Sequence, residues 1–490
     1  MKTLLMYPDR VFFPPEEYPF EKELLVNDLE LGVILDAMAK GDEAMRAACK
    51  AALLNYCTEE SEILYRQEIL KELMETPQFA RDMYAVAVET LYRRKKEHVW
   101  LQSQMNALFR GAVEILRMTM EQLKKLRAVA DSYHGKFKSR GLVGLIDMLR
   151  AELSDDYFAE VNAHLEELSF NDGMLVSARF GEKLQGEKYT MRRLDKKGIK
   201  LKWMFAPSVS ISSKDEDGLK DLELRKARVI SEDVNVLAQA TDHVLQFFTS
   251  LRDELGFYVG CLNLKETLEA NGLPVCMPAI EKGGRRRTYA NLYDASLPLI
   301  GVKGVVGNDM DYSEKTLFII TGANQGGKST FLRSLGQSQV MLQCGMFTAA
   351  ASYRAHIASG IFTHFRKEED AKMDSGKLDE ELERMSRIAN HVKKGALVMF
   401  NESFAATNER EGAEIGRQIT QALLDCGMEV FSVTHLYQLS NPFYAKNDLN
   451  YVFLRAERLS DGQRSFRLSE GEPQRTGYGD DVYKRVFGDE

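Results

Sequence analysis

Apolar side chains recur every three or four residues along much of the first half of the chain. This spacing places such side chains on one face of a helix. Helix interiors exclude proline, and only Pro77 and Pro207 occur between residues 20 and 273. The pattern therefore predicts a mostly helical first half. Its most regular stripe predicts one long helix and consists of Met105, Phe109, Val113, Leu116, Met120, Leu123 and Leu126.

The helical pattern is interrupted after residue 168. Residues 174–180 and 188–194 have the composition of two short strands, and a glycine-bearing segment joins them. We therefore expect a small β insert at about residues 169–215.

Helical spacing resumes near residue 221 and predicts a long returning helix, which Gly256 and Gly260 are expected to loosen. Residues 1–257 should then form an elongated helical domain that carries the β insert. Beyond it, buried strands alternate with helices, which is typical of an α/β fold with a mostly parallel sheet. We assign this second domain to residues 258–490. Within it, a linker-like stretch with Pro274, Pro278, Gly283 and Gly284 precedes the alternating strands and helices.

The composition of the chain bears on whether the protein spans a membrane or is exported. No stretch offers the roughly 20 apolar residues that a membrane span requires, so we expect a soluble chain. The first residues lack the features of an export signal, and the six cysteines have neither zinc spacing nor a C-x-x-C pair. A reduced, cytoplasmic location is therefore expected.

The net charge of the chain and its local distribution indicate whether the protein could bind nucleic acid. The net charge of −8 argues against a protein that coats nucleic acid with its whole surface. Residues 179–202 of the β insert nevertheless hold nine basic and three acidic residues, which could contact phosphates without reading sequence. A hairpin that is charged only for solubility would look the same. The candidate DNA contacts are Arg179, Lys188, Arg192, Arg193, Lys196 and Lys197.

A glycine-rich loop carries the most specific chemistry in the sequence. Residues 316–321 (TLFIIT) read as a buried strand that runs into GANQGGKST, which satisfies G-x-x-x-x-G-K-S/T. Glycines at these positions let main-chain N–H groups turn toward phosphate oxygens, and the helix that follows directs its positive end there. Lys328 would neutralise phosphate charge, and Ser329 would bind Mg²⁺. The predicted ATP-binding residues are Gly322, Asn324, Gly326, Gly327, Lys328, Ser329 and Thr330.

Two later strands also end in polar residues. Residues 396–400 lead into Asn401 and Glu402, and residues 428–433 lead into Thr434 and His435. Ligands of α/β sheets bind at the carboxyl ends of strands. Glu402 could activate a water molecule, and Asn401 offers a neutral oxygen near the metal. His435 could contact the γ-phosphate, although a lone histidine more often only forms hydrogen bonds with neighbouring residues and has no functional role.

Together these segments resemble the ATPase domain of the MutS family of DNA mismatch-repair proteins, within the ABC-type ATPases. The resemblance rests on FIITGANQGGKSTFLRSLGQ, CGMFTAA, IFTHF, ALVMFNESFAATNEREG and SVTHLYQL. It implies a fold with a helical core, lever and clamp followed by the ATPase domain, without the family's mismatch-recognition domain. It also implies that Ser375 reaches the γ-phosphate of a facing subunit. Asn401 replaces the aspartate that the family pattern has, which predicts weakened metal binding.

The resemblance implies a homodimeric, Mg²⁺-dependent ATPase whose ATP-driven closure grips and releases DNA. The alternative is a slowly hydrolysing, ATP-gated scaffold with protein partners, which Asn401 and the negative net charge favour. A kinase of small substrates is a third reading, but it explains neither the helical half nor the histidine segment.

Overall fold

The computed structural model describes residues 1–15, 17–98, 105–168, 175–180, 186–192, 210–212, 214–323, 325–366, 377–458 and 464–474. The chain forms two compact units of mutually contacting residues. Unit 1 comprises residues 1–4 and 78–255, and unit 2 comprises residues 5–77 and 256–490. The division into domains 1–257 and 258–490 stays a prediction.

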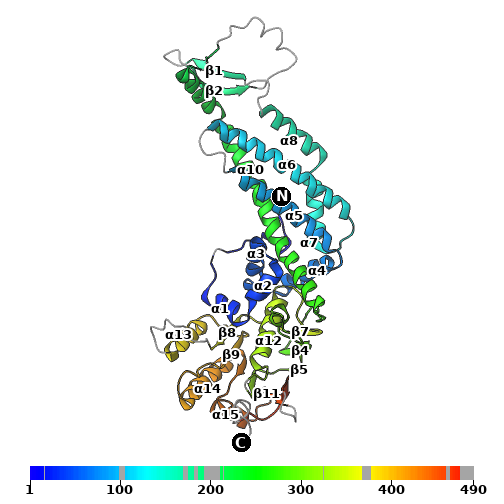
Figure 1. Cartoon of the computed structure of the whole chain (residues 1–490), viewed down its shortest axis with the longest axis vertical. Coiled ribbons are helices and arrows are strands. Elements are labelled where there is room, and N and C mark those ends of the chain that lie inside the picture. Colours follow the sequence, from blue (N-terminus) through cyan, green and yellow to red (C-terminus); the bar gives the residue numbers. More distant parts are fainter. Residues whose placement is uncertain are drawn as a thin grey trace. The chain divides into compact units, whose positions relative to one another are not determined.

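Helices dominate the described part of unit 1, whereas unit 2 combines helices with two sheets (Figure 1). The helices are α1 (Phe20–Asp28), α2 (Leu31–Ala39), α3 (Glu43–Leu54), α4 (Glu60–Glu75), α5 (Pro77–His98), α6 (Met105–Tyr133), α7 (Arg140–Glu152), α8 (Asp155–Leu168), α10 (Glu216–Ala270), α11 (Ser296–Leu299), α12 (Lys328–Gln343), α13 (Lys377–Ala389), α14 (Glu409–Asp425) and α15 (Tyr437–Ala445). The strands are β1 (Leu175–Phe180), β2 (Gly186–Arg192), β3 (Ala279–Ile280), β4 (Arg286–Leu292), β5 (Asn308–Ser313), β6 (Leu317–Thr321), β7 (Ser352–Ala355), β8 (Ile361–Phe365), β9 (Leu397–Asn401), β10 (Glu429–Val433), β11 (Tyr451–Arg458) and β12 (Arg464–Glu470).

Unit 1 is held together by the apolar faces of its helices. The long helix that the sequence predicts is α6, and its stripe is buried at Val113, Leu116, Met120, Leu123 and Leu126. The side chains of Met105 and Phe109, the other two predicted members, lie outside the described part of the structure. Ile115 and Met118 of α6 pack with Leu245 of α10. The predicted long helix and the burial of its stripe at these five positions are therefore confirmed.

The predicted β insert is an antiparallel pair of strands, β1 and β2. The pairing joins Leu175 to Arg192 and Phe180 to Gly186, with an irregularity between Ser177 and Arg179. The described part of the second strand, Gly186–Arg192, includes residues 188–192 of the predicted strand 188–194, and residues 193 and 194 lie outside the described part.

The prediction that Gly256 and Gly260 loosen the returning helix is wrong, because α10 continues through both to Ala270. Within unit 2, Gly260 allows close packing. A Cβ atom on Gly260 would lie 2.5 Å from Cys49 Sγ of α3 and 3.3 Å from Met38 of α2. The Cys49 thiol donates to the Gly256 carbonyl. A missing side chain here allows neighbouring helices to approach, an advantage that local helix propensity does not reveal.

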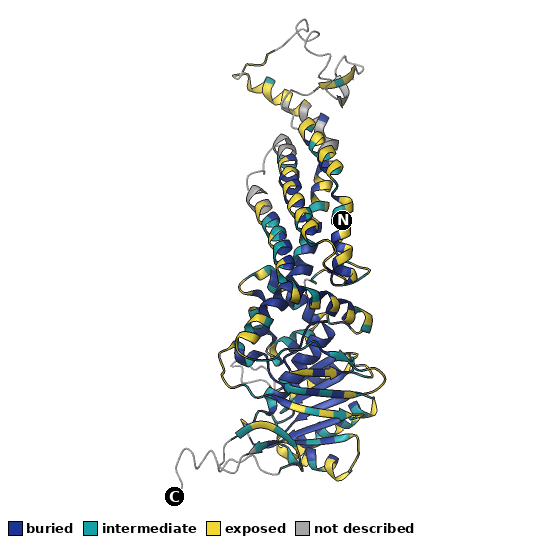
Figure 2. Ribbon diagram, turned by 90° about the vertical axis from the view of Figure 1, so that its right-hand side faces the viewer, coloured by how far each residue is buried: buried dark blue, intermediate teal, exposed yellow. Residues whose placement is uncertain are grey.

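A six-stranded sheet forms the centre of unit 2, in the order β12-β11-β6-β10-β9-β8. The five strands from β11 to β8 run parallel, and β12 is antiparallel to β11. The mostly parallel sheet is thus confirmed, and so are the three apolar strands of the sequence, as β6, β9 and β10. All residues of β6, β8 and β10 are buried (Figure 2).

Each face of this sheet is covered by helices. Alternate residues such as Ile319, Val398 and Val430 belong to a core formed with α13, α14 and α15. The other face includes Phe318 and Phe431, whose rings stack with centroids 4.1 Å apart, and α12 contacts β8, β9 and β10. The parallel strands therefore lie in the middle of three layers, which leaves their ends as the accessible edges.

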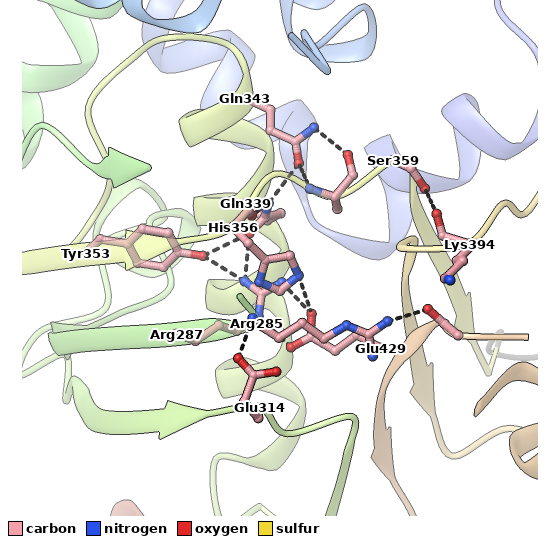
Figure 3. Close-up of polar contacts among 12 residues, drawn as sticks. Arg285, Arg287, Glu314, Gln339, Gln343, Tyr353, His356, Ser359, Lys394 and Glu429 are labelled. Carbon is pink, nitrogen blue, oxygen red and sulfur yellow. Dashed lines mark hydrogen bonds and ion pairs between the residues drawn. The ribbon is translucent and has the colours of Figure 1, made fainter. Parts of the chain in front are cut away.

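A second sheet, of four strands in the order β3-β7-β4-β5, adjoins α12. A buried ion pair connects it to the six-stranded sheet (Figure 3). Arg287 of β4 donates from Nε and Nη2 to the two carboxylate oxygens of Glu429 in β10, at 2.8 and 2.7 Å. Both side chains are 3% exposed. Gln339 of α12 accepts from Arg287 Nη1, and His356 Nε2 lies 3.3 Å from the Glu429 carboxylate.

Among the described residues, no helix is long and apolar enough to cross a membrane.

Candidate functional site

The glycine-rich loop connects β6 to α12, as the sequence predicts. Gly322 and Gly327 have φ angles of 113° and 89°, a left-handed region that side chains disfavour. The loop also runs close to β11 and β12. A Cβ atom on Gly326 would lie 2.7 Å from the Ala456 Cβ, and one on Gly327 would lie 3.4 Å from the Phe466 carbonyl oxygen. Both backbone conformation and close approach therefore require glycine in this loop.

Lys328 is the first residue of α12 and its side chain is buried. Its Nζ donates to the carbonyl oxygens of Gly322 and Ala323, at 2.8 and 2.9 Å. Burial lowers the pKa of Lys328, an effect that the charge of Glu402 opposes and that of Arg464 reinforces. The ammonium group is thus held inside the loop beside the N-terminus of a helix, an arrangement suited to an anion.

Ser329 and Asn401 meet at this edge of the sheet. The hydroxyl of Ser329 donates to Asn401 Oδ1 at 2.9 Å, although the two residues are 72 positions apart. A hydroxyl and an amide oxygen are both ligand types that Mg²⁺ accepts, and Mg²⁺ commonly completes its shell with phosphates and water. Among the described residues, no group of three or more His, Cys, Asp and Glu side chains could hold a metal by itself. The Ser329 hydroxyl and the Asn401 amide oxygen are suited by their chemistry to Mg²⁺ that is also bound by a phosphate.

Glu402 and His435 form the second polar pair. His435 Nε2 lies 2.6 Å from Glu402 Oε1, and each side chain is about one-third exposed. The hydrogen bond from His435 lowers the pKa of Glu402, burial opposes it, and the charges of His435, Lys328 and Arg366 lower it further. The carboxylate therefore stays ionised at neutral pH and can accept a proton or orient water.

Main-chain hydrogen bonds bring these strand ends together. The Glu402 N–H donates to the Val433 carbonyl, and the Thr434 N–H donates to Ile320. Parallel neighbours β9, β10 and β6 thus end side by side, which places the two polar pairs beside the glycine-rich loop. Glu402, directly after β9, has a φ of 54°, a main-chain conformation that residues with side chains seldom adopt.

Two residues of β12 also lie near this site, and sequence reasoning missed both. Arg464 has a buried Nη1 that makes no hydrogen bond to any described residue, and its charge acts on Lys328. Phe466 is 47% exposed, has a φ of 58°, and lies against Gly327. Asn308 of β5 holds this segment by donating to the Phe466 carbonyl and accepting from the Leu468 N–H. Neither residue belongs to a recognisable motif, so no sequence signal pointed to them.

For the remaining predicted site residues, the structure describes only some positions and side chains. Thr330 lies in the first turn of α12 and is partly buried. Asn324 and Ser375 lie outside the described residues. Of the candidate DNA contacts, Arg179 is exposed on β1, and Lys188 and Arg192 lie on β2, where their side chains are not described. Arg193, Lys196 and Lys197 lie beyond the described part. The roles of all these residues stay predictions.

The fold and these groups define an α/β protein whose glycine-rich loop, buried lysine and carboxylate–histidine pair share the carboxyl edge of a parallel sheet. Two family models match this chain: the MutS2 N-terminal domain over residues 58–271 and MutS domain V over residues 318–484. The chain belongs to the MutS family, as the sequence resemblance predicts.

Curated relatives support the same family. Endonuclease MutS2 of Lacticaseibacillus casei (strain BL23) is 31% identical over 188 residues, which are 38% of this chain and 24% of that protein. Endonuclease MutS2 of Pediococcus pentosaceus is 29% identical over 231 residues, 46% of this chain and 29% of that protein. MutS protein homolog 4 of Mus musculus is 24% identical over 184 residues, 36% of this chain and 19% of that protein. The chain thus matches less than a third of the length of each of these relatives.

Proposed function

We propose that the protein is an ATPase that binds and hydrolyses ATP with Mg²⁺ at a homodimer interface and thereby grips and releases DNA. The observation that carries this proposal is the meeting of Lys328, the Ser329–Asn401 pair and the Glu402–His435 pair at one sheet edge. Catalysis of phosphoryl transfer consists mainly of positioning and of stabilising charge, and these groups supply both.

Each residue has a role in this proposal. The loop from Gly322 to Gly327 and the Lys328 ammonium bind the phosphates, and Arg464 adds a second cation near Lys328. Ser329 and Asn401 would hold Mg²⁺, whose chemistry is to neutralise phosphate charge. The Glu402 carboxylate orients the attacking water and accepts its proton. Ser375 would act from the facing subunit.

His435 has a role of its own in this proposal, because it is hydrogen-bonded to one carboxylate oxygen of Glu402. In the structure its Nε2 contacts the Glu402 carboxylate at 2.6 Å. We propose that ATP exchanges this contact for one between His435 and the γ-phosphate. The exchange would leave the carboxylate free for water only when nucleotide is in place.

The proposal is tested by measuring the rate of ATP turnover at increasing protein concentrations. Each series is measured without DNA and with double-stranded, single-stranded or branched DNA. Sites shared between two subunits predict a specific activity that rises with protein concentration, and a clamp predicts that DNA shifts it. ATP binding without any turnover would instead support an ATP-gated scaffold, which Asn401 favours. Phosphate transfer to a small acceptor would support the kinase reading.

Phe466 is expected to stack on the adenine base, because this residue is 47% exposed and its carbonyl oxygen, Cα and Cβ atoms lie next to Gly327, directly before α12. Stacking of a base on an aromatic ring contributes about 1–3 kcal/mol, so Phe466→Ala should weaken ATP binding by roughly 5- to 150-fold. Fluorescence titration with a labelled ATP analogue measures this. Phe466→Tyr keeps the ring and should bind normally; an unchanged affinity for Phe466→Ala would show that the base lies elsewhere.

Asn401→Asp is expected to lower the Mg²⁺ concentration that supports half-maximal turnover, by roughly 10-fold, because a carboxylate binds this ion better than an amide. A Mg²⁺ titration of ATP turnover measures the change. Asn408→Asp is the matched control: Asn408 caps α14 by accepting from the Glu411 N–H, and aspartate caps equally well. If the native protein, Asn401→Asp and Asn408→Asp all show the same Mg²⁺ dependence, Asn401 is not a ligand of the metal.

A further inference from the structure

A buried histidine connects three segments around the turn that carries Glu402. His364 lies in β8 and is fully buried. Its Nδ1 is 2.8 Å from Ser403 Oγ, directly after Glu402, and its Nε2 is 3.0 Å from the main-chain oxygen of Glu381 in α13. None of the roles proposed above uses this residue.

The partners of His364 determine where its proton lies. A carbonyl oxygen only accepts, so the contact with Glu381 requires a hydrogen on Nε2. In the neutral ring Nδ1 then accepts, and the Ser403 hydroxyl shares its one hydrogen between Nδ1 and the His364 carbonyl oxygen, to which it also donates. Burial lowers the pKa of His364 to about 4, so the ring is neutral at physiological pH. The network therefore selects the Nε2–H tautomer.

The same ring supports an unusual stretch of main chain. Glu402 and Phe404 have φ angles of 54° and 63°, and residues with side chains keep this conformation only where their surroundings hold it. Ser403 between them is held through its hydroxyl. The His364 ring stacks on that of Phe404, with centroids 5.1 Å apart and planes 19° apart. His364 thus contacts both residues that follow Glu402.

The third segment, α13, is itself anchored to the end of β8. Arg384 of α13 donates to the Phe365 carbonyl at 2.7 Å and pairs with Asp28 of α1. A displacement of α13 would therefore act on the Glu381 carbonyl and reach Ser403 through the imidazole ring.

We propose that His364 is a positioning residue: as the neutral Nε2–H tautomer it fixes the main chain at residues 402–404, and it connects the direction of the Glu402 carboxylate to α13. This inference rests on the proposed ATPase function. A displaced carboxylate would leave ATP binding intact but would slow the chemical step, since a misplacement of about 1 Å can lower a rate by roughly 100-fold.

Kinetics of two variants test the proposal. His364→Gln and Ser403→Ala should each lower kcat by roughly 10- to 100-fold, with the Kd for ATP changed by less than about 3-fold. Ser403→Ala keeps the buried ring in place, so it remains informative if His364→Gln folds poorly. His391→Gln is the matched control, because His391 is exposed and should leave kcat unchanged. Wild-type kcat in Ser403→Ala would overturn the proposal.

Nitrogen NMR of ¹⁵N-histidine-labelled protein gives a readout independent of turnover. The His364 signal should show the Nε2–H tautomer. The His435 signal should shift in Ser403→Ala, because His435 Nε2 contacts the Glu402 carboxylate. An Nδ1–H tautomer or an unmoved His435 signal would overturn the inference. Absence of turnover in the wild-type protein would instead overturn the ATPase function, so the two failures are distinguishable.

Discussion

Glu402→Gln is expected to lower ATP turnover by about 10²- to 10⁴-fold while ATP still binds, because a positioned general base contributes that much to a rate. The hydrogen bond from His435 and nearby positive charges lower the pKa of Glu402, so the native residue is ionised and can take a proton from water. Glutamine keeps the size and one oxygen of the side chain but accepts no proton.

Binding should survive the substitution for a structural reason. The groups assigned to the phosphates are the loop, Lys328 and Ser329, and Lys328 is held by two carbonyl oxygens of the loop rather than by Glu402. Single-turnover measurements with labelled ATP would separate binding from the chemical step. Glu409→Gln, in the exposed first turn of α14, is the matched control and should turn over ATP normally. Normal turnover in Glu402→Gln would exclude Glu402 as the base.

Removing one partner of the buried Arg287–Glu429 pair is expected to destabilise the protein by about 3–5 kcal/mol, because an unpaired charge is left without water. The carboxylate accepts two hydrogen bonds from Arg287, and both side chains are buried (Figure 3). Arg287→Met should therefore lower the urea midpoint markedly. Its sequence neighbour provides the control: Arg286 pairs with Asp311 at the surface, so Arg286→Met should change the midpoint little.

The double variant Arg287→Met/Glu429→Leu separates the cost of an unpaired charge from the cost of lost packing. Replacing both charges with apolar groups should recover much of the loss, since buried ion pairs are often close to neutral overall. A double variant no more stable than Arg287→Met would show that packing rather than charge dominates here.

The same pair predicts how stability depends on pH. Burial by itself would raise the pKa of Glu429, but Arg287 and then His356 outweigh it and lower the pKa to about 2. A carboxyl whose pKa is depressed in the folded state contributes its full stability above its unfolded value of 4.5 and loses it as the pH falls toward 2. Glu429→Gln should flatten the stability curve of the protein in that interval.

The sequence by itself determined those features of the protein that depend only on residues close together in the chain, namely single helices, strands and the glycine-rich loop. The periodic stripe of α6, the β1–β2 pair and the apolar strands β6, β9 and β10 follow from side-chain spacing that is complete within one segment. The glycine-rich loop is equally local, because a strand, a turn of glycines and a helix N-terminus follow one another directly. The MutS resemblance rested on such segments, and the family models confirm it.

Only the tertiary structure decided which segments meet. Arg287 and Glu429 are 142 positions apart, and His364 and Ser403 are 39 apart. Arg464 and Phe466 reach the glycine-rich loop because β12 pairs with β11, which in turn pairs with β6. Gly256 and Gly260 looked like helix breakers, yet α10 continues through both, and Gly260 allows it to pack against α2 and α3. Strand order and close packing are properties of the whole fold, so spacing along the chain does not encode them locally.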